Sequence, residues 1–264
     1  MKILALGDPH GKLPKDIPKN IDLILIPGDI GKADLARKKS FENKKRVQQG
    51  LPKLKETARD IKEIHNEIHK STLKILRYLS RYAPVYTLQG NVGIPSNSQV
   101  RKDYEKYRLK LDSTMEQLKK INGVSIVKNR LRVINGLRIG FLEYFTDTSW
   151  VKEFKPKDYE NFMKKAKRQT DKARRVLRSF DMNLNILLCH QPPYGFLDRV
   201  NFPGAPKNWQ GKHAGSEVIL NYIKRYQPKY VLCGHIHEAK GIKRIGKTTI
   251  INLGSSGDYR IINL

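Results

Sequence analysis

The chain has 264 residues, of which 52 are Lys or Arg and 25 are Asp or Glu, so its formal net charge is +27. This length allows one α/β domain with a sizeable core, and two cysteines are too few for a disulfide framework. The cysteine count leads us to expect a reducing, cytoplasmic compartment. No apolar run approaches the length that crosses a bilayer, which excludes a membrane-spanning class and leads us to expect no membrane partner.

Short apolar runs alternate with long charged segments along the chain. The runs are rich in β-branched or aromatic residues, as strands buried on both faces are. In chain order, we predict strands at residues 3–6, 23–26, 85–88, 125–127, 132–134, 138–142, 186–189, 230–233, 241–245, 248–252 and 260–263. The pair Asn135-Gly136 is a favourable hairpin turn between two of these strands.

Helical patterns fill the segments between the strands. We predict helices at about residues 34–82, with a break at Gly50-Leu51-Pro52, and at about residues 100–121, 156–180 and 215–226. Strands that alternate with helices indicate an α/β fold, and the hairpins late in the chain indicate a mixed sheet or two sheets face to face. We expect one domain over residues 1–264, with a charged helical insertion at about 34–82.

Five of the predicted strands are each followed closely by Asp, Asn or His. In open α/β sheets, ligands bind beyond the carboxyl ends of the strands, so these side chains are expected to meet. Taken singly, each has an ordinary interpretation as a turn residue, a helix cap or a packed histidine. Their occurrence together favours a shared site. The set is Asp8, His10, Asp29, Asn91, His190, His235 and His237.

The chemistry of this set suits two divalent metal ions. Imidazole and carboxylate groups bind Mn, Fe, Zn or Ni, and the carboxylates favour Mn. Seven side chains with one shared carboxylate supply about four ligands for each ion. Two carboxylates facing two divalent ions leave a net positive charge of about two, which suits a phosphate group.

The ordered motifs Asp8-x-His10, Gly28-Asp29, Gly90-Asn91, His190 and Gly234-His235-x-His237 resemble the calcineurin-like metallophosphoesterase superfamily. The resemblance extends from residue 2 to residue 252. It implies an α/β sandwich of two mixed β-sheets flanked by helices, in four layers, and hydrolysis of phosphate esters. It also implies that Asp8, His10, Asp29 and His237 hold one metal ion. Asn91, His190 and His235 would hold the second, and Asp29 would bridge the two ions and hold a metal-bridging hydroxide.

The sequence departs from the family pattern directly after Asn91. Many members have a His there that contacts the phosphate and protonates the leaving group, whereas this chain has Val92-Gly93. Some branches that look like this one also lack that His and hydrolyse phosphodiesters. The departure therefore concerns protonation of the leaving group and not metal binding.

Three further residues are candidates for contacts with the substrate. His213 lies in a Gly-rich stretch before a predicted helix, where it either serves as a replacement acid or phosphate contact or orders the loop. Arg199 and Lys212 are candidate substrate-binding cations, with ordinary surface charge as the alternative. Asn91 is expected to contact the substrate as well as the metal.

The positive charge gathers in two predicted helical segments. Residues 34–81 contain 14 Lys or Arg against 6 Asp or Glu, and residues 152–178 contain 11 against 4. Such charge either binds nucleic acid or nucleotides, or it is a solvated surface, and the oligomeric state is equally open. We predict a metal-dependent hydrolase, a phosphodiesterase that acts on a phosphate-ester substrate. The alternatives are a DNA or RNA nuclease and, in a different class, a non-catalytic metal-binding scaffold.

Overall fold

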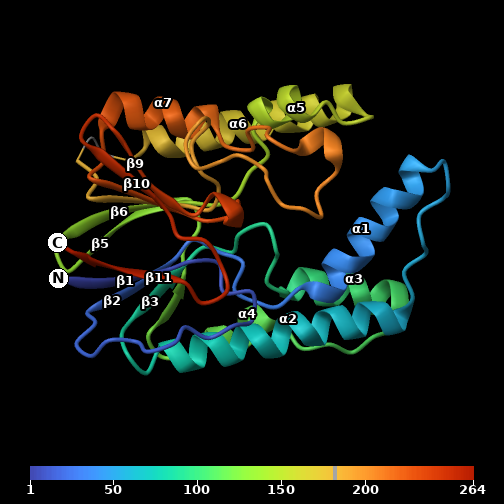
Figure 1. The fold of residues 1–264 in the computed structure, drawn as a ribbon. Helices are drawn as coiled ribbons and strands as arrows, with labels where there is room; N and C mark the ends of the chain where they lie inside the picture. The colour runs from blue at the N-terminus through green and yellow to red at the C-terminus, as the bar shows by residue number, and fades with distance from the viewer. Residues whose placement is uncertain (181–182) are drawn as a thin grey trace.

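The computed structural model describes residues 1–180 and 183–264 and contains two β-sheets packed face to face (Figure 1). All eleven predicted strands are present, with ends within two residues of those expected. In the first sheet the strand order is β11 (Tyr259–Asn263), β1 (Lys2–Leu6), β2 (Leu23–Ile26), β3 (Val85–Thr87) and β4 (Val124–Ile126). Strands β1 to β4 are parallel, and β11 is antiparallel to β1.

The second sheet has the order β5 (Arg130–Ile134), β6 (Leu137–Leu142), β7 (Ile186–Cys189), β8 (Tyr230–Cys233), β10 (Thr248–Asn252) and β9 (Gly241–Ile245). Its four central strands are parallel, and β5 and β9 are antiparallel at the edges. The β5–β6 hairpin turns at Asn135 and Gly136, both with positive φ, as the sequence predicts. Both sheets are therefore mixed, as expected.

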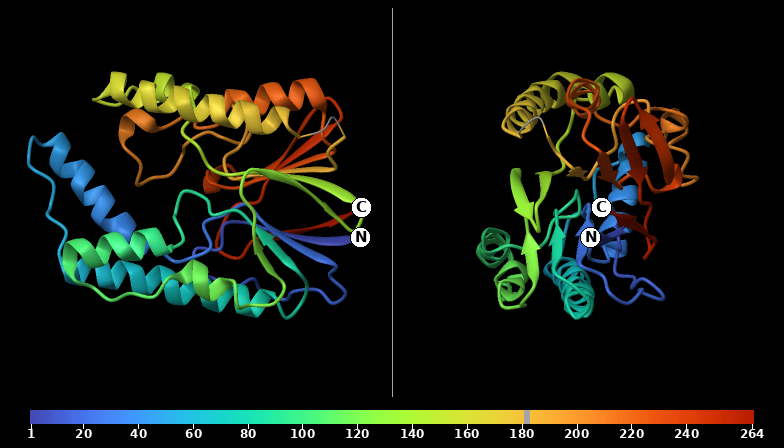
Figure 2. Two further views of the ribbon diagram at one scale, coloured as in Figure 1. Left: turned by 180° about the vertical axis from the view of Figure 1, so that it is seen from behind. Right: turned by 90° about the vertical axis from the view of Figure 1, so that its left-hand side faces the viewer.

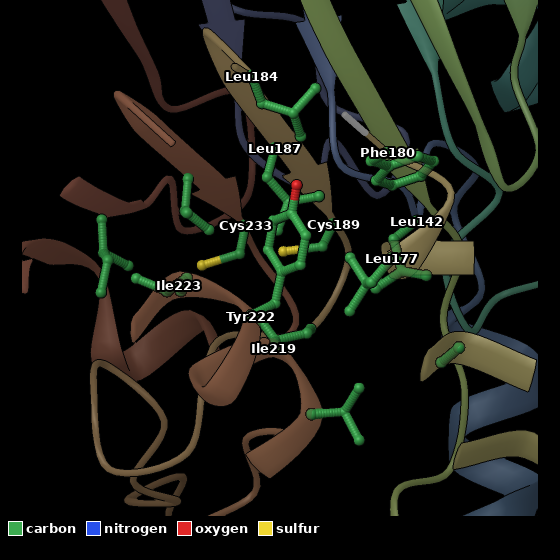
Figure 3. Packing of buried hydrophobic residues seen from close by; sticks show 14 of the residues in the cluster. Leu142, Leu177, Phe180, Leu184, Leu187, Cys189, Ile219, Tyr222, Ile223 and Cys233 are labelled. Carbon is green, nitrogen blue, oxygen red and sulfur yellow. The ribbon is translucent and has the colours of Figure 1, made fainter. Parts of the chain in front are cut away.

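Alternate residues of the central strands face opposite layers. Ile3 of β1 and Ile186 of β7 point into the core between the sheets, whereas Leu4 and Leu187 face the helices outside. Because both faces are covered, these strands read as continuous apolar runs. Figure 3 shows the outer core of the second sheet, where Leu187 and both cysteines pack among helical side chains.

Helices cover the outer face of each sheet and complete a four-layer sandwich (Figures 1 and 2). Helices α2 (Ala58–Leu79), α3 (Asn97–Tyr107) and α4 (Thr114–Leu118) lie on the side of the first sheet. Helices α5 (Thr148–Phe154), α6 (Tyr159–Arg178) and α7 (Glu217–Tyr226) lie on the side of the second. Helix α1 (Asp34–Gln48) rises from the first side toward the second, and the short 3₁₀ helices are Lys207–Trp209 and His237–Ala239.

The helix predictions differ from the structure at two places. The predicted helix at 100–121 is divided because Arg108 adopts a left-handed conformation at the end of α3 and Ser113 begins α4 by capping it. Helix α5 is absent from the prediction, since it spans only seven residues and begins at the Asp147 cap. Within the described residues, no helix is both long and apolar enough to cross a membrane.

The packing between the two sheets predicts a large cost for removing Phe141. This side chain is fully buried, and its ring lies 6.2 Å from that of Tyr86 in the opposite sheet. Phe141→Ala is expected to lower the free energy of unfolding by about 3–5 kcal/mol, measured by equilibrium denaturation in urea. The control Val133→Ala, at a side chain 61% exposed, should change it by less than about 0.5 kcal/mol. Equal effects of the two variants would contradict this packing.

Candidate metal centre

The structure brings the seven predicted ligand residues together at the carboxyl ends of five parallel strands. Asp8 and His10 follow β1, Asp29 follows β2 and Asn91 follows β3 in the first sheet, and the histidines at 190, 235 and 237 follow β7 and β8 of the second. Each sheet therefore supplies part of the cluster, and the packing of the two sheets sets the distance between the parts.

Asp8, His10 and His237 form a first group with ligand atoms turned toward one another. The Nε2 atom of His237 lies 3.2 Å from Oδ2 of Asp8 and 3.2 Å from Nε2 of His10. These atoms lie close enough together for a single metal ion to contact them all.

Asn91, His190 and His235 form a second group around the amide oxygen of Asn91. Oδ1 of Asn91 lies 2.7 Å from Nε2 of His190 and 2.8 Å from Nδ1 of His235. On its other side, the His190 ring has Nδ1 3.1 Å from the carbonyl oxygen of Pro27, which accepts a hydrogen bond from that nitrogen. This bond fixes the tautomer, so that Nε2 presents its lone pair to the group.

The carboxylate of Asp29 lies between the two groups. Its Oδ2 atom is 3.8 Å from Nε2 of His10 and 3.7 Å from Nε2 of His190. Its Oδ1 atom accepts a hydrogen bond of 2.7 Å from the backbone N–H of Val92. Residue 92 thus contributes its backbone N–H, which orients Asp29 independently of the side chain at position 92.

The backbone approaches these ligands closely enough to require glycine at two motif positions. A Cβ atom on Gly90 would lie 2.2 Å from Oδ1 of Asp29, and one on Gly234 would lie 2.5 Å from Oδ1 of Asp8. His10, Asp29 and His235 themselves adopt positive φ, which is unusual for residues with a side chain. Strain of this kind persists only where the surrounding structure enforces it, and it is frequent at functional sites.

Burial keeps two of the histidines, His10 and His235, in the neutral form that binds metal. It lowers the pKa of His10 to about 3, with a further contribution from the positive charge of Arg37, and it lowers the pKa of His235 to about 3. Both rings are therefore neutral near pH 7. Burial raises the pKa of Asp29, whereas for Asp8 the neighbouring histidines outweigh burial and hold the pKa below its usual value.

The site fits divalent cations on two observations. Oδ1 of Asp8 is fully buried and has no hydrogen-bond partner among the described residues, which is costly unless a cation is present. Asp29 is equally enclosed, at 2% exposure, and burial together with the nearby charge of Asp8 raises its pKa, so that a cation beside it would stabilise the ionised form. A donor set of imidazole nitrogens, carboxylates and an amide oxygen suits Mn, Fe, Zn or Ni.

A family model described as metallophosphoesterase, calcineurin superfamily, matches residues 8–264. The chain belongs to this superfamily. The predicted resemblance is thereby confirmed, and membership of this family supports a metal-dependent hydrolase of phosphate esters.

Relatives of this metallophosphoesterase range from animals to archaea. The human metallophosphoesterase domain-containing protein 1 is 41% identical over 70 residues, which are 26% of this chain and 19% of that protein. A UPF0046 protein of Caenorhabditis elegans is 37% identical over 68 residues, 26% of this chain and 20% of its own length. The match thus spans about a fifth of both animal proteins. An uncharacterized protein of Methanocaldococcus jannaschii is 23% identical over 259 residues, 96% of this chain and 87% of the other.

The fold is also that of a solved hydrolase. The crystal structure of phosphopantetheinyl hydrolase (PptH) from Mycobacterium tuberculosis gives a TM-score of 0.54 at 14% identity and covers 97% of this chain and 90% of its own. This similarity confirms the predicted sandwich of two mixed sheets.

The three candidate substrate-binding residues of this metallophosphoesterase belong to the loop at residues 198–213, and each makes a polar contact within the protein. Nδ1 of His213 lies 2.7 Å from Oδ1 of Asp198, Arg199 donates to the carbonyl oxygen of Gly211, and Lys212 donates to that of Glu153. These contacts order the loop at 198–213. Their role toward a substrate stays a prediction.

Two residues at the site are absent from the sequence-based set. Nη2 of Arg37, on α1, lies 2.8 Å from Nε2 and 3.1 Å from Nδ1 of the His10 ring. Tyr144 packs against the rings of His190 and His235, with centroids 5.7 and 5.2 Å away. Tyr144 follows β6 as the ligands follow their strands, which is a usable signal, but Arg37 is one of many cations in its segment.

The position of Asp29 predicts different effects for two ligand substitutions. We expect the purified, metal-loaded chain to hold about two transition-metal ions, measured by inductively coupled plasma mass spectrometry. Asp29→Ala should lower the content of both ions because its carboxylate adjoins both groups, whereas His235→Ala should mainly weaken one. The control Asp171→Ala, an exposed carboxylate on α6, should retain both. Normal metal content in Asp29→Ala would show that this carboxylate bridges nothing.

Proposed function

We propose that this metallophosphoesterase is a phosphodiesterase that uses two metal ions, with Mn as the favoured metal, held by the seven clustered side chains. The observation that carries the proposal is the carboxylate of Asp29, whose Oδ2 atom lies within 3.8 Å of a ligand nitrogen in each group. Two ions bound there would polarise the phosphoryl oxygens and supply an activated water as the nucleophile. The free, buried cysteines support a reducing, cytoplasmic setting.

The protein's own residues position these components. Val92 N–H holds Oδ1 of Asp29, which leaves Oδ2 directed at both groups. The Pro27 carbonyl holds the ring of His190, and Asp8 Oδ2 accepts a hydrogen bond of 2.7 Å from the backbone N–H of His235. Such supporting bonds keep the ligand geometry fixed, so that little reorganisation is needed when a phosphate binds.

Arg37 is the cation best placed to contact the phosphate. Its guanidinium reaches the His10 ring from α1, with Nη2 2.8 Å from Nε2. Guanidinium groups bind phosphate oxygens through paired N–H donors and remain charged at every physiological pH. Arg37 would therefore stabilise charge on the phosphate, but it would not protonate the leaving group.

Replacement of Arg37 tests its role directly. Arg37→Ala is expected to lower kcat/KM for bis-p-nitrophenyl phosphate by about 10²-fold, as loss of one donor to a developing oxyanion does. Arg37→Lys should recover part of this loss, since it restores the charge without the paired donors. The matched control is Arg59→Ala, an exposed arginine that pairs with Glu63 on α2, and it should leave kcat/KM unchanged. Equal activity in Arg37→Ala and the wild type would remove Arg37 from the site.

Val92 leads to a prediction about leaving groups. A positioned acid contributes roughly 10²–10⁴-fold to such reactions, and the side chain of Val92 cannot act as one. Rates for a series of phosphodiesters should therefore fall steeply as the leaving-group pKa rises, with nitrophenyl esters hydrolysed fastest. His213→Ala should leave this slope nearly unchanged, because the His213 ring engages Asp198.

Two results would oppose this account. If His213→Ala harmed alkyl esters far more than nitrophenyl esters, His213 would be the acid. If the metal-loaded wild type hydrolysed no phosphate ester and chelation changed nothing, the chain would be a metal-binding scaffold.

A further inference from the structure

A large cleft opens between the two halves of the molecule. It has a volume of about 1240 Å³ and is lined on one side by α1, the start of α2 and the end of α3, and on the other by α5, the start of α6 and the 3₁₀ helix at Lys207–Trp209. Figure 1 shows these elements facing one another on the right-hand side, at the same end of the sheets as the carboxyl ends of the parallel strands. We call this feature the lysine cleft.

The lining of the lysine cleft is strongly positive. Seven lysines and one glutamate contribute to it, and one of the lysines, Lys39, pairs with Asp60 at 2.7 Å. Lys53, Lys55 and Lys155 lie at its two sides with exposed side chains. A concave surface lined by one sign of charge attracts a polyanion over long distances.

Aromatic rings lie among these lysines. The ring of Trp209 packs edge-on against Phe154 at 5.1 Å, and the Phe162 side chain is 42% exposed within the cleft. Positive grooves with exposed aromatic rings are typical of proteins that bind single strands, because unpaired bases stack on the rings with little regard to sequence. An acidic peptide would use the lysines but has no need of the rings.

Helix α1 connects the lysine cleft to the metal centre. Arg37, Phe41 and Lys44 share one face of this helix, at spacings of four and three residues. Arg37 contacts His10, the ring of Phe41 lies 6.5 Å from that of Phe202, and Lys44 lies 5.0 Å above the ring of Trp209. These three side chains thus extend along about 10 Å of α1, from the metal ligand His10 to the ring of Trp209.

We propose that the lysine cleft binds single-stranded nucleic acid and directs one of its phosphodiesters to the metal centre. This inference rests on the proposed function, since it names the substrate class of the same site. The lysines would contact successive phosphates, Trp209 and Phe162 would stack on bases, and Arg37 would hold the phosphate nearest to the metal ligands.

Binding and hydrolysis are measured separately to test this proposal. A fluorescent thymidine oligonucleotide of about 12 residues, with phosphorothioate linkages that resist cleavage, is titrated with the metal-loaded chain at about 50 to 200 mM KCl, and its anisotropy is recorded. Hydrolysis of bis-p-nitrophenyl phosphate is followed in parallel. This small substrate needs the metal centre but not the lysine cleft, so all cleft variants should hydrolyse it normally.

Two triple variants of equal charge provide the comparison. Lys53→Ala/Lys55→Ala/Lys155→Ala should weaken binding at least about tenfold and reduce the slope of log K against log salt by about 2, the value for three lost contacts to a single strand. Lys243→Ala/Arg244→Ala/Lys247→Ala removes three exposed cations from the β9–β10 hairpin, at the opposite end of the sheets, and should change binding less than twofold. Equal losses in the two triples would overturn the proposal.

The role of the aromatic rings in the lysine cleft is tested in the same assay. Phe162→Ala should weaken binding by about 5- to 150-fold, the loss of one stacked base, while the exposed Val133→Ala should not. Tighter binding of a duplex of the same length would overturn the assignment to single strands.

The two assays distinguish failure of the proposed function from failure of this inference. If binding depends on the lysine cleft but no phosphodiester is hydrolysed, the proposed phosphodiesterase function is wrong, whereas the cleft still binds single-stranded nucleic acid. If hydrolysis is normal and the cleft variants bind as the wild type does, the inference alone fails.

Discussion

The carboxylate of Asp29 is almost completely buried between two groups of metal-binding side chains, and much of the local structure serves to keep it there. An ionised carboxylate in such a place is costly without a cation, and the raised pKa of Asp29 expresses that cost. The glycine at 90 leaves room for its oxygen, the N–H of Val92 fixes its orientation, and its own backbone adopts a positive φ. These features have no evident use in packing. They are explained together if divalent cations supply the missing charge.

The sandwich explains how ligands far apart in the sequence meet around that carboxylate. Parallel strands deliver their next residues at the same edge, and two parallel regions packed face to face place two such edges side by side. Cross-links between the loops then set the final distances. The N–H of Asp8 donates to the carbonyl oxygen of Gly254, the N–H of His235 donates to the Asp8 carboxylate, and Asn252 donates to the carbonyl oxygen of Ile236. The core between the sheets is therefore part of the site, because each group of ligands contains residues from both sheets and a shift of one sheet against the other would pull each group apart.

The strands and the ligand set could be predicted because their signals are local. A run such as residues 186–189 is apolar since both its faces are covered, and a ligand such as His190 follows it at once. Arg37 could not be found in this way, since it lies on a helix whose sequence is uniformly rich in lysine and arginine, and only the direction of α1 brings it to His10. The division of the helix predicted at 100–121 was missed for a related reason. A left-handed residue at Arg108 leaves the apolar pattern unchanged, although it ends the helix.

Residue 92 is Val where many members of the superfamily have His, so other residues must supply the contacts that determine substrate specificity. Residue 92 orients Asp29 through its backbone N–H, so this contact does not depend on the side chain at position 92. Contacts to the substrate then have to come from elements that enter the site from outside the sheets. Helix α1 supplies one in Arg37 and presents Phe41 and Lys44 on the same face, toward the loop that carries Phe202 and Trp209. A cation that cannot release a proton, followed by rings and lysines, suits recognition of an extended anionic substrate better than protonation of a poor leaving group. The enzyme's selectivity would then depend on how tightly the neighbouring parts of the substrate bind, since binding energy gained there can position the phosphodiester for attack.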